Sequence, residues 1–376
     1  MSANLSNWRE SPHNVWAFHN IDKILPTKVV STSETEPSPL KANPQSFDGF
    51  KIQLGSSPEL GLAGYEKYTE TDGLVVLHKG KVVHEYYDHG NEPSSRHILM
   101  SLTKSVTGLV TGILASQGAL DVTKPINHYL PETSSLFANV TIQHCLDMNT
   151  GVTFEDGNHE YRAAGGWNPL RGDEPHTTLH AYLTNAEAPT AGPGVGFNYT
   201  SLNTDLLGMC LERITGKQLP DLISALLWQP LGAESDAFMP VDGAGSARAA
   251  GAFCATVRDL ARVGQLVADG GRGIVPASWL EDMQHGGSSS AFAAGSWAPA
   301  FTAEFSTLAY RDCWLADSES GICFGLGIHG QMLMVDRVHD VVMAKTSSQA
   351  NPTDFGAVKL SVRAFKEMTR ILLLQS

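Results

Sequence analysis

Residues 101–118 read SLTKSVTGLVTGILASQG, with a serine and a lysine three positions apart at the start of an apolar segment that ends at a glycine. A glycine of this kind is typical of a helix C-terminus, so we predict a helix from about Leu102 to Gln117. Side chains three apart share a helix face, which places Ser101 beside Lys104. Burial disfavours a charged lysine, and a neutral amine can take the proton of a serine hydroxyl. The pattern therefore indicates a serine nucleophile with a lysine base.

The tetrapeptide alone is a weak signal. A serine at this place can simply cap the helix, with the lysine exposed to solvent, and on spacing alone that interpretation is favoured. Ser38-Pro39-Leu40-Lys41 has the same spacing, but there the proline places the pair in a loop. The assignment of a serine nucleophile therefore depends on other parts of the chain.

The elements around this helix predict a fold in which both chain ends build one sheet. A β-hairpin is expected from residues 74–77 and 82–87, and three further strands from 323–328, 332–335 and 341–344. Helical stretches are expected near 139–148, 203–215, 218–227, 256–269, 277–284 and 356–374. This order favours an α+β class with one antiparallel sheet and a helical subdomain inserted between its two halves. In this arrangement residues 1–98 contain the N-terminal arm and the first part of the sheet domain, residues 99–295 form the mainly helical subdomain, and residues 296–376 form the second part of the sheet domain.

Two further segments carry residues suited to chemistry. A Pro/Gly turn at 193–196 delivers Tyr199 to the start of a helix. The positive end of a helix dipole favours partial phenolate character, and such a tyrosine can pass a proton to a leaving group. In residues 324–331 glycines alternate along a strand, which lets another backbone or a ligand approach closely. Taken singly, a half-buried tyrosine beside helix-capping residues and a sheet strand with a bulge are the favoured interpretations of these segments.

Composition narrows the class of protein. The chain has 376 residues, 42% hydrophobic and 17% charged, as in ordinary globular proteins, and a formal net charge of −13. The negative charge disfavours nucleic acid and anionic membranes as partners. No apolar run is long enough to span a bilayer, and no secretory signal is recognisable. With five scattered cysteines, these features lead us to expect a cytoplasmic protein without a disulfide framework.

The three segments, in this order, resemble the S-x-x-K, Y-x-N and K-T-G boxes of serine β-lactamases and penicillin-binding proteins. Residues 120–132, 141–151 and 256–262 also look like connecting segments of the class C β-lactamase/esterase branch. Residues 8–18, 96–101 and 327–331 are similar to an amidase subgroup that also hydrolyses carboxylic esters. The resemblance covers nearly the whole chain. It implies a β-lactamase-like fold, with a central antiparallel sheet of about five strands flanked by helices, plus an all-helical subdomain.

The resemblance also implies roles for residues. Ser101 would attack a carbonyl and become acylated, with Lys104 as base, alone or together with Tyr199. Tyr199 would protonate the leaving group and later help to activate water. The backbone N–H groups of Ser101 and Ile328 would form the oxyanion hole.

Two departures from the family pattern bear on substrate choice. Ser201 stands where the Y-x-N box has its asparagine, with Asn203 two positions further on. The tripeptide 325–327 lacks the K-T-G cation, which predicts weak action on penicillins and a preference for neutral acyl groups. We expect residues 154–172 to form a lid or pocket wall. The expected substrate contacts are Ser201, Asn203, Trp167, Tyr161, Gly327 and, less strongly, His329, with Arg162 as a further candidate.

The favoured function is hydrolysis of small carboxylic esters, with amides as further substrates, through an acyl-enzyme. An acyltransferase using the same acyl-enzyme is an alternative, and a non-catalytic binding or sensor protein of the same fold is another. Neither a metal nor another cofactor is expected. The segment His84-Glu85-Tyr86-Tyr87-Asp88-His89 is one residue too long for the H-E-x-x-H zinc motif. A small-molecule substrate is the expected partner, and a homodimer remains open.

Overall fold

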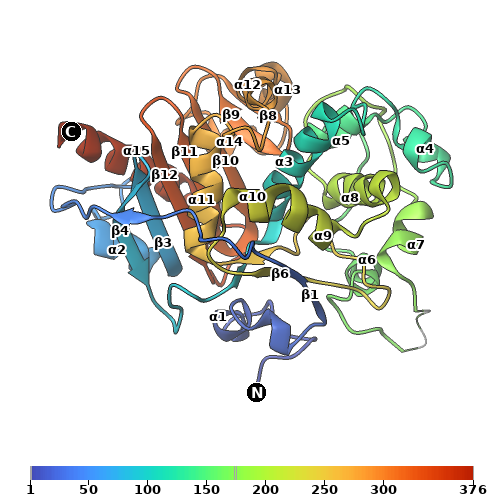
Figure 1. Ribbon diagram of the computed structural model, residues 1–376, viewed down its shortest axis with the longest axis horizontal. Coiled ribbons are helices and arrows are strands. Elements are labelled where there is room, and N and C mark those ends of the chain that lie inside the picture. Colours follow the sequence, from blue (N-terminus) through green and yellow to red (C-terminus); the bar gives the residue numbers. More distant parts are fainter. Residues whose placement is uncertain (1, 173, 175, 376) are drawn as a thin grey trace.

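The computed structural model describes residues 2–172, 174 and 176–375. An eight-stranded sheet fills one part of the molecule and a set of helices fills the other (Figure 1). Its strand order is β2-β4-β3-β12-β11-β10-β9-β8. The bounds are β2 Lys41–Ala42, β3 Thr71–His78, β4 Lys81–Tyr87, β8 Leu308–Arg311, β9 Trp314–Asp317, β10 Ile322–Gly327, β11 Gln331–Asp336 and β12 Val341–Ser347.

The five predicted strands are β3, β4, β10, β11 and β12, and they pair antiparallel. The expected number of strands was too small, because β8 and β9 extend one edge and the two-residue β2 adds a parallel pairing at the other. A second, four-stranded sheet has the order β1-β6-β7-β5. Its strands are β1 Thr27–Val30, β5 His97–Ile98, β6 Ala237–Pro240 and β7 Cys254–Ala255.

The helices surround the large sheet and form the remainder of the molecule. Their bounds are α1 His13–Ala17, α2 Leu62–Tyr68, α3 Thr103–Ser116, α4 Ile126–Tyr129, α5 Ile142–Leu146, α6 His159–Ala164, α7 Leu179–Thr184, α8 Ser201–Thr215, α9 Leu219–Ile223, α10 Gln229–Leu231, α11 Val257–Ala268, α12 Ala277–His285, α13 Ser289–Ala293, α14 Ala298–Phe301 and α15 Phe355–Leu374. The predicted helix at 218–227 instead ends at Ile223 and continues as a π-helical turn, Ser224–Trp228.

The large sheet separates two apolar cores, which explains the uninterrupted apolar runs of its central strands. In β3, Val75 and Leu77 join one core, whereas Leu74 and Val76 join the other. The first core continues into α3 and α11, and the second contains the buried face of α15. Thr256 is the N-cap of α11, and its side chain accepts a hydrogen bond from the Asp259 N–H.

Helix α11 packs on β3, β11 and β12, so part of the stretch 99–295 lies on the sheet (Figure 1). Helices α4, α5, α7 and α8 lie together at the far side from the sheet (Figure 1). The division of the chain at residues 98 and 295 stays a prediction.

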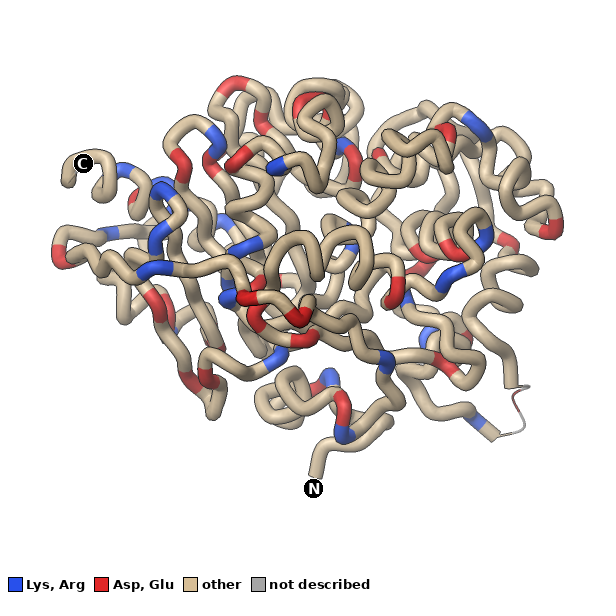
Figure 2. Tube along the Cα trace, viewed as in Figure 1, with Lys and Arg blue, Asp and Glu red and all other residues tan. Residues whose placement is uncertain are grey.

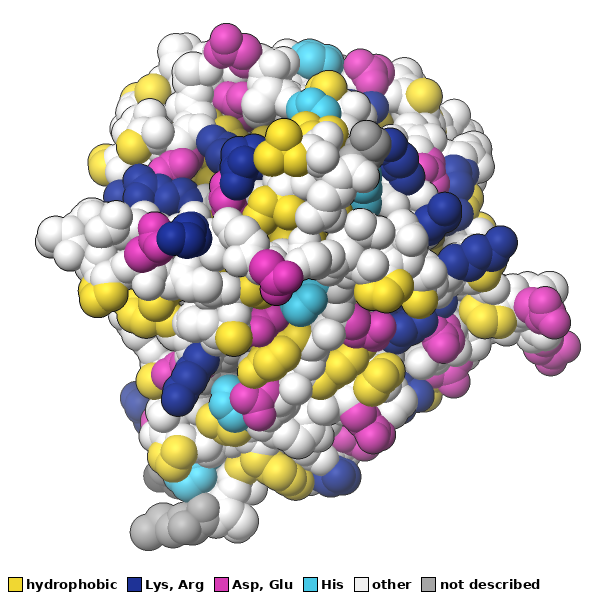
Figure 3. All heavy atoms as spheres, turned by 90° about the vertical axis from the view of Figure 1, so that its left-hand side faces the viewer, with side chains coloured by type: hydrophobic (Ala, Val, Ile, Leu, Met, Phe, Trp, Pro, Cys, Tyr) yellow, Lys and Arg dark blue, Asp and Glu magenta, His cyan; other side chains and the backbone are white. Residues whose placement is uncertain are grey.

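Charged residues of both signs occur across the whole molecule (Figure 2). On the face of the molecule at the left of Figure 1, acidic, basic and hydrophobic side chains are interspersed (Figure 3). No helix among the described residues is long and apolar enough to cross a membrane.

Candidate active site

Ser101 lies in a single 3₁₀ turn, Met100–Leu102, that leads directly into α3. The residue before it, Met100, has φ of 49°, a left-handed conformation that a side chain adopts only at a cost of about 1–3 kcal/mol. Such strain persists only where the surrounding structure imposes it. The backbone conformation of Met100 sets the direction in which the Ser101 side chain points. Ser101 does not cap the helix with its side chain. The simple capping interpretation of the serine is therefore wrong.

Lys104 is 1% exposed, and its amine makes three hydrogen bonds. Nζ lies 2.9 Å from Ser101 Oγ, 3.1 Å from Ser201 Oγ and 2.8 Å from the Ala250 carbonyl oxygen. The carbonyl can only accept. Ser201 Oγ lies 2.6 Å from an Asp156 carboxylate oxygen, to which it donates its proton, so toward Lys104 it also accepts. When the amine is neutral, its lone pair is therefore left for the Ser101 hydroxyl, the geometry that a general base needs.

Burial lowers the pKa of Lys104 to about 8, while the carboxylates of Asp156 and Asp205 act in the opposite direction. A substantial fraction of the amine is therefore neutral near neutral pH.

Tyr199 lies two residues before α8, and its ring is stacked on Trp297 with the centroids 4.3 Å apart. The amine of Lys104 lies 4.8 Å from the centroid of the Tyr199 ring. Burial raises the pKa of Tyr199, against a hydrogen bond with Ser101 that lowers it. The expected partial phenolate is therefore wrong: the position near the helix N-terminus does not offset the loss of solvent, and Tyr199 keeps its proton.

A cavity of about 360 Å³ opens at Ser101 and Tyr199, and Lys104 lies buried beside it without lining it. Of the predicted site residues, it is lined by Ser101, Tyr199, Ile328, Ser201, Trp167, Gly327 and Arg162. Gly327 is required there because a Cβ would lie 2.4 Å from the Leu99 carbonyl oxygen. The glycine thus lets β10 approach the backbone that precedes Ser101.

Three predicted substrate contacts do not reach this cavity. Tyr161 is fully buried and donates its hydroxyl to Asp205. Asn203 is also fully buried and accepts a hydrogen bond from Thr150. His329 donates from Nδ1 to the Gln349 carbonyl oxygen at 2.6 Å and packs against Phe18. Sequence position placed them near the site, but each side chain has a structural partner elsewhere.

Tyr161 nevertheless contributes to the position of Lys104 through Asp205. That carboxylate accepts hydrogen bonds from the Tyr161 hydroxyl, from Arg248 Nε at 3.1 Å and from the Ala250 N–H at 2.8 Å. The contacts fix the loop whose Ala250 carbonyl holds Lys104.

The structure also adds residues that the sequence did not single out: Asp156, Arg9, Arg248 and Trp297 all line the cavity. Asp156 accepts hydrogen bonds from the Ser201 N–H and hydroxyl, so it caps α8 while it orients Ser201. These residues belong to loops or to the N-terminal segment, and no local pattern marks them.

The strand β10 carries no cation at 325–327, as predicted, but Arg9 and Arg162 face the same cavity. The predicted preference for neutral acyl groups assumed that the site has no cation, and these two arginines contradict that assumption.

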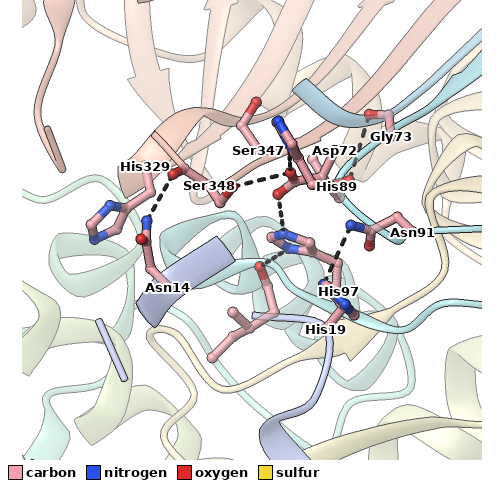
Figure 4. Close-up of polar contacts among 12 residues, drawn as sticks. Asn14, His19, Asp72, Gly73, His89, Asn91, His97, His329, Ser347 and Ser348 are labelled. Carbon is pink, nitrogen blue, oxygen red and sulfur yellow. Dashed lines mark hydrogen bonds and ion pairs between the residues drawn. The ribbon is translucent and has the colours of Figure 1, made fainter. Parts of the chain in front are cut away.

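A buried network behind the cavity joins both halves of the chain (Figure 4). Asp72 accepts hydrogen bonds from His89 Nδ1 at 2.7 Å, His97 Nε2 at 2.9 Å and Ser348 Oγ at 3.0 Å. Burial opposes ionisation of Asp72, but these hydrogen bonds hold its pKa below the ordinary value. Asn14 donates to the Ser348 carbonyl oxygen at 2.7 Å. The network thereby fixes the segment after β12, which forms part of the cavity wall.

Comparison with known proteins shows the family to which this chain belongs. The beta-lactamase family model matches residues 65–365. The chain is 34% identical over 361 residues to 6-aminohexanoate-dimer hydrolase of Paenarthrobacter ureafaciens, covering 93% of this chain and 88% of that protein. It is 32% identical over 154 residues, 38% of each chain, to esterase EstB of Burkholderia gladioli.

A solved structure assigned as a 6-aminohexanoate-dimer hydrolase from Bacillus anthracis has a TM-score of 0.89 and 26% identity, and the match covers 99% of both chains. The chain therefore belongs to the beta-lactamase family, as its three sequence boxes indicated, and to the part of it that contains amide and ester hydrolases. One relative that matches most of its length is 6-aminohexanoate-dimer hydrolase.

Proposed function

We propose that this protein hydrolyses small carboxylic esters, and amides more slowly, through an acyl-enzyme on Ser101. The observation that carries the proposal is the contact between Lys104 Nζ and Ser101 Oγ, together with the two acceptors that direct the amine's lone pair toward that hydroxyl. The named activities of two relatives, an amide hydrolase and an esterase, support the same reaction class.

In the proposed acylation, Lys104 takes the hydroxyl proton of Ser101 as the oxygen attacks the substrate carbonyl. The oxyanion is stabilised by the backbone N–H groups of Ser101 and Ile328, since preorganised donors favour the charge that develops there. Tyr199, kept protonated by burial, gives its proton to the leaving oxygen or nitrogen. The ammonium of Lys104, next to the Tyr199 ring, then restores that proton.

Deacylation reverses these steps with water in place of the leaving group. Water gives its proton to the Tyr199–Lys104 pair and attacks the acyl carbonyl, and Ser101 recovers its hydrogen as the acid departs. An ester leaving group needs less help from the acid than an amide does, because an alkoxide is a better leaving group than an amide anion. The proposal therefore predicts that amide hydrolysis depends more strongly on Tyr199.

The variant Tyr199→Phe tests this assignment. It keeps the aromatic stack on Trp297 and removes only the hydroxyl. We expect kcat/KM for 4-nitrobutyranilide to fall by about 10²–10⁴-fold, the usual contribution of general acid–base catalysis. The loss for 4-nitrophenyl butyrate should be smaller.

Tyr182→Phe is the matched control, because Tyr182 lies on α7 and does not line the cavity. Equal, small losses in both Tyr→Phe variants would remove Tyr199 from the mechanism.

A further inference from the structure

Two arginine side chains in the cavity form no ion pair with a described carboxylate. Arg9 and Arg162 line the same cavity as Ser101, and only more distant carboxylates act on them: Glu10 on Arg9, and Asp156 and Glu155 on Arg162. By contrast Arg248, on the same cavity, is paired with Asp205 at 3.1 Å. A guanidinium stays protonated in proteins, so two positive charges without a direct ion-pair partner face the space that would hold a substrate.

The hydrogen-bonding capacity of both guanidiniums is largely unused. Arg162 donates from Nε to the Asp156 carbonyl oxygen at 3.1 Å, and its two terminal nitrogens have no described partner. Arg9 donates to the side chain of Asn168 and, at 3.5 Å, to the Trp167 carbonyl oxygen. A guanidinium carries five N–H donors, so several remain on each residue.

The carboxylates of the cavity are already engaged elsewhere. Asp156 accepts hydrogen bonds from the backbone and hydroxyl of Ser201. Asp354 accepts from the Ala357 N–H and caps α15. These carboxylate oxygens therefore do not accept hydrogen bonds from Arg9 or Arg162, although the charge of Asp156 still raises the pKa of Arg162.

Packing holds Arg9 in place without neutralising it. Its guanidinium lies 5.0 Å from the centroid of the Trp8 ring and 5.9 Å from that of Trp167. Burial, and then the charges of Arg162 and Arg248, lower the pKa of Arg9, which is the expected sign for a cation held near other cations. A bound anion would act in the opposite direction, because an opposite charge nearby favours the charged form of Arg9.

A second cavity, of about 380 Å³, adjoins the first and is also lined by Arg9, Arg162, Ile328 and Pro352. The two guanidiniums therefore lie at the boundary of the cavity that contains Ser101. They stand on the side of Ile328, the residue that supplies the proposed oxyanion N–H.

We propose that Arg9 and Arg162 form a carboxylate-binding subsite, and that the preferred substrates are esters or amides carrying a free carboxylate apart from the scissile carbonyl. Arginine suits this task because its planar fork matches the two oxygens of a carboxylate. The proposal rests on the hydrolase function argued above and specifies its substrate class. The carboxylate can belong to the acyl group, as in a half-ester of a dicarboxylic acid, or to the leaving group.

Matched pairs of substrates test the proposal. For the acyl side, the 4-nitrophenyl half-esters of succinate, glutarate and adipate are compared with their methyl-capped diesters. For the leaving-group side, 4-(carboxymethyl)phenyl butyrate is compared with the corresponding carbamoylmethyl compound. We expect kcat/KM for the carboxylate to exceed that for its neutral partner by about 10- to 100-fold in at least one pair, as a charged hydrogen bond contributes. The pair that shows the preference identifies which part of the substrate carries the carboxylate.

The variants Arg9→Met and Arg162→Met connect this preference with the two residues. Each should reduce the ratio of the two kcat/KM values by about tenfold or more. Arg171→Met makes the same change of charge at an exposed side chain of the neighbouring segment and should keep the ratio. A ratio near one in the unmodified protein, or a ratio that both Arg→Met variants preserve, would overturn the subsite.

Failure of the subsite can be distinguished from failure of the hydrolase function. If neutral and charged esters are both hydrolysed at equal rates, the function stands and the subsite is wrong. If neither is hydrolysed, the proposed function itself fails. Should both arginine variants fail to fold, inhibition of the unmodified protein decides: glutarate should inhibit ester hydrolysis at least tenfold more strongly than glutaramide, and equal inhibition would contradict the proposal.

Discussion

Ser101→Ala should reduce kcat/KM for 4-nitrophenyl butyrate by about 10⁴–10⁶-fold, the scale of loss when a catalytic serine is removed. The variant deletes the oxygen that forms the acyl bond but changes nothing else in the turn that begins α3. Because the side chain makes no helix cap, the free energy of unfolding should change little. The measurement is initial-rate kinetics together with urea unfolding of both proteins.

Ser105→Ala is the control for this variant. Ser105 lies one turn further along the same buried helix and donates to the Cys313 carbonyl oxygen. Its loss removes a nearby, more deeply buried hydroxyl without touching the proposed nucleophile, so the rate should stay within a few-fold of the unmodified protein. If Ser101→Ala kept full esterase activity, the nucleophile would have to be sought elsewhere.

Lys104→Met should reduce kcat/KM by about 10²–10⁴-fold, because it removes the base and keeps a side chain of similar length. Lys345→Met is a matched control: Lys345 is also completely buried, but it lies on β12 and its amine contacts the Thr69 and Gly330 carbonyl oxygens instead of Ser101. A loss of similar size in both variants would show that burial of a lysine, rather than base catalysis, is responsible.

The pH dependence gives this assignment a second, independent readout. Catalysis needs the neutral amine, and burial lowers the pKa of Lys104 to about 8. The value of kcat/KM should therefore rise with pH, pass its midpoint near pH 8 and level off above it.

Asp156→Asn should move that midpoint to lower pH, since the carboxylate of Asp156 raises the pKa of Lys104. A midpoint that moves upward, or one that does not respond to this change, would contradict the role of Lys104.

The local elements of the fold were predictable because they depend on short-range periodicity. The expected helix from Leu102 to Gln117 corresponds to α3, Thr103–Ser116, and the final helix expected at 356–374 corresponds to α15, Phe355–Leu374. The strands β8 and β9 were missed, since each has only four residues and lacks an alternating pattern. Their place is determined by pairing with β10, which is a long-range contact.

The candidate site also contains residues that could be predicted from the sequence and residues that could not. Ser101, Lys104 and Tyr199 could be found because each stands at the start of a helix in a recognisable box. The segment 154–172, predicted as a wall, also lines the cavity through Asp156, Arg162 and Trp167. The contributions of Arg9 and Trp297 could not be predicted, because these residues come from distant segments that meet only when the chain folds. Tyr161 shows the converse: it belongs to the predicted wall segment, yet its hydroxyl serves the buried Asp205.

The most direct test is to trap the acyl-enzyme itself. The protein is quenched with acid during turnover of 4-nitrophenyl butyrate, weighed intact by mass spectrometry, and digested to locate the added group. We expect a gain equal to one butyryl group on the peptide that contains Ser101, and no gain in Ser101→Ala. Turnover with no covalent adduct at any time, or a butyryl group found only on another residue, would contradict the proposed mechanism.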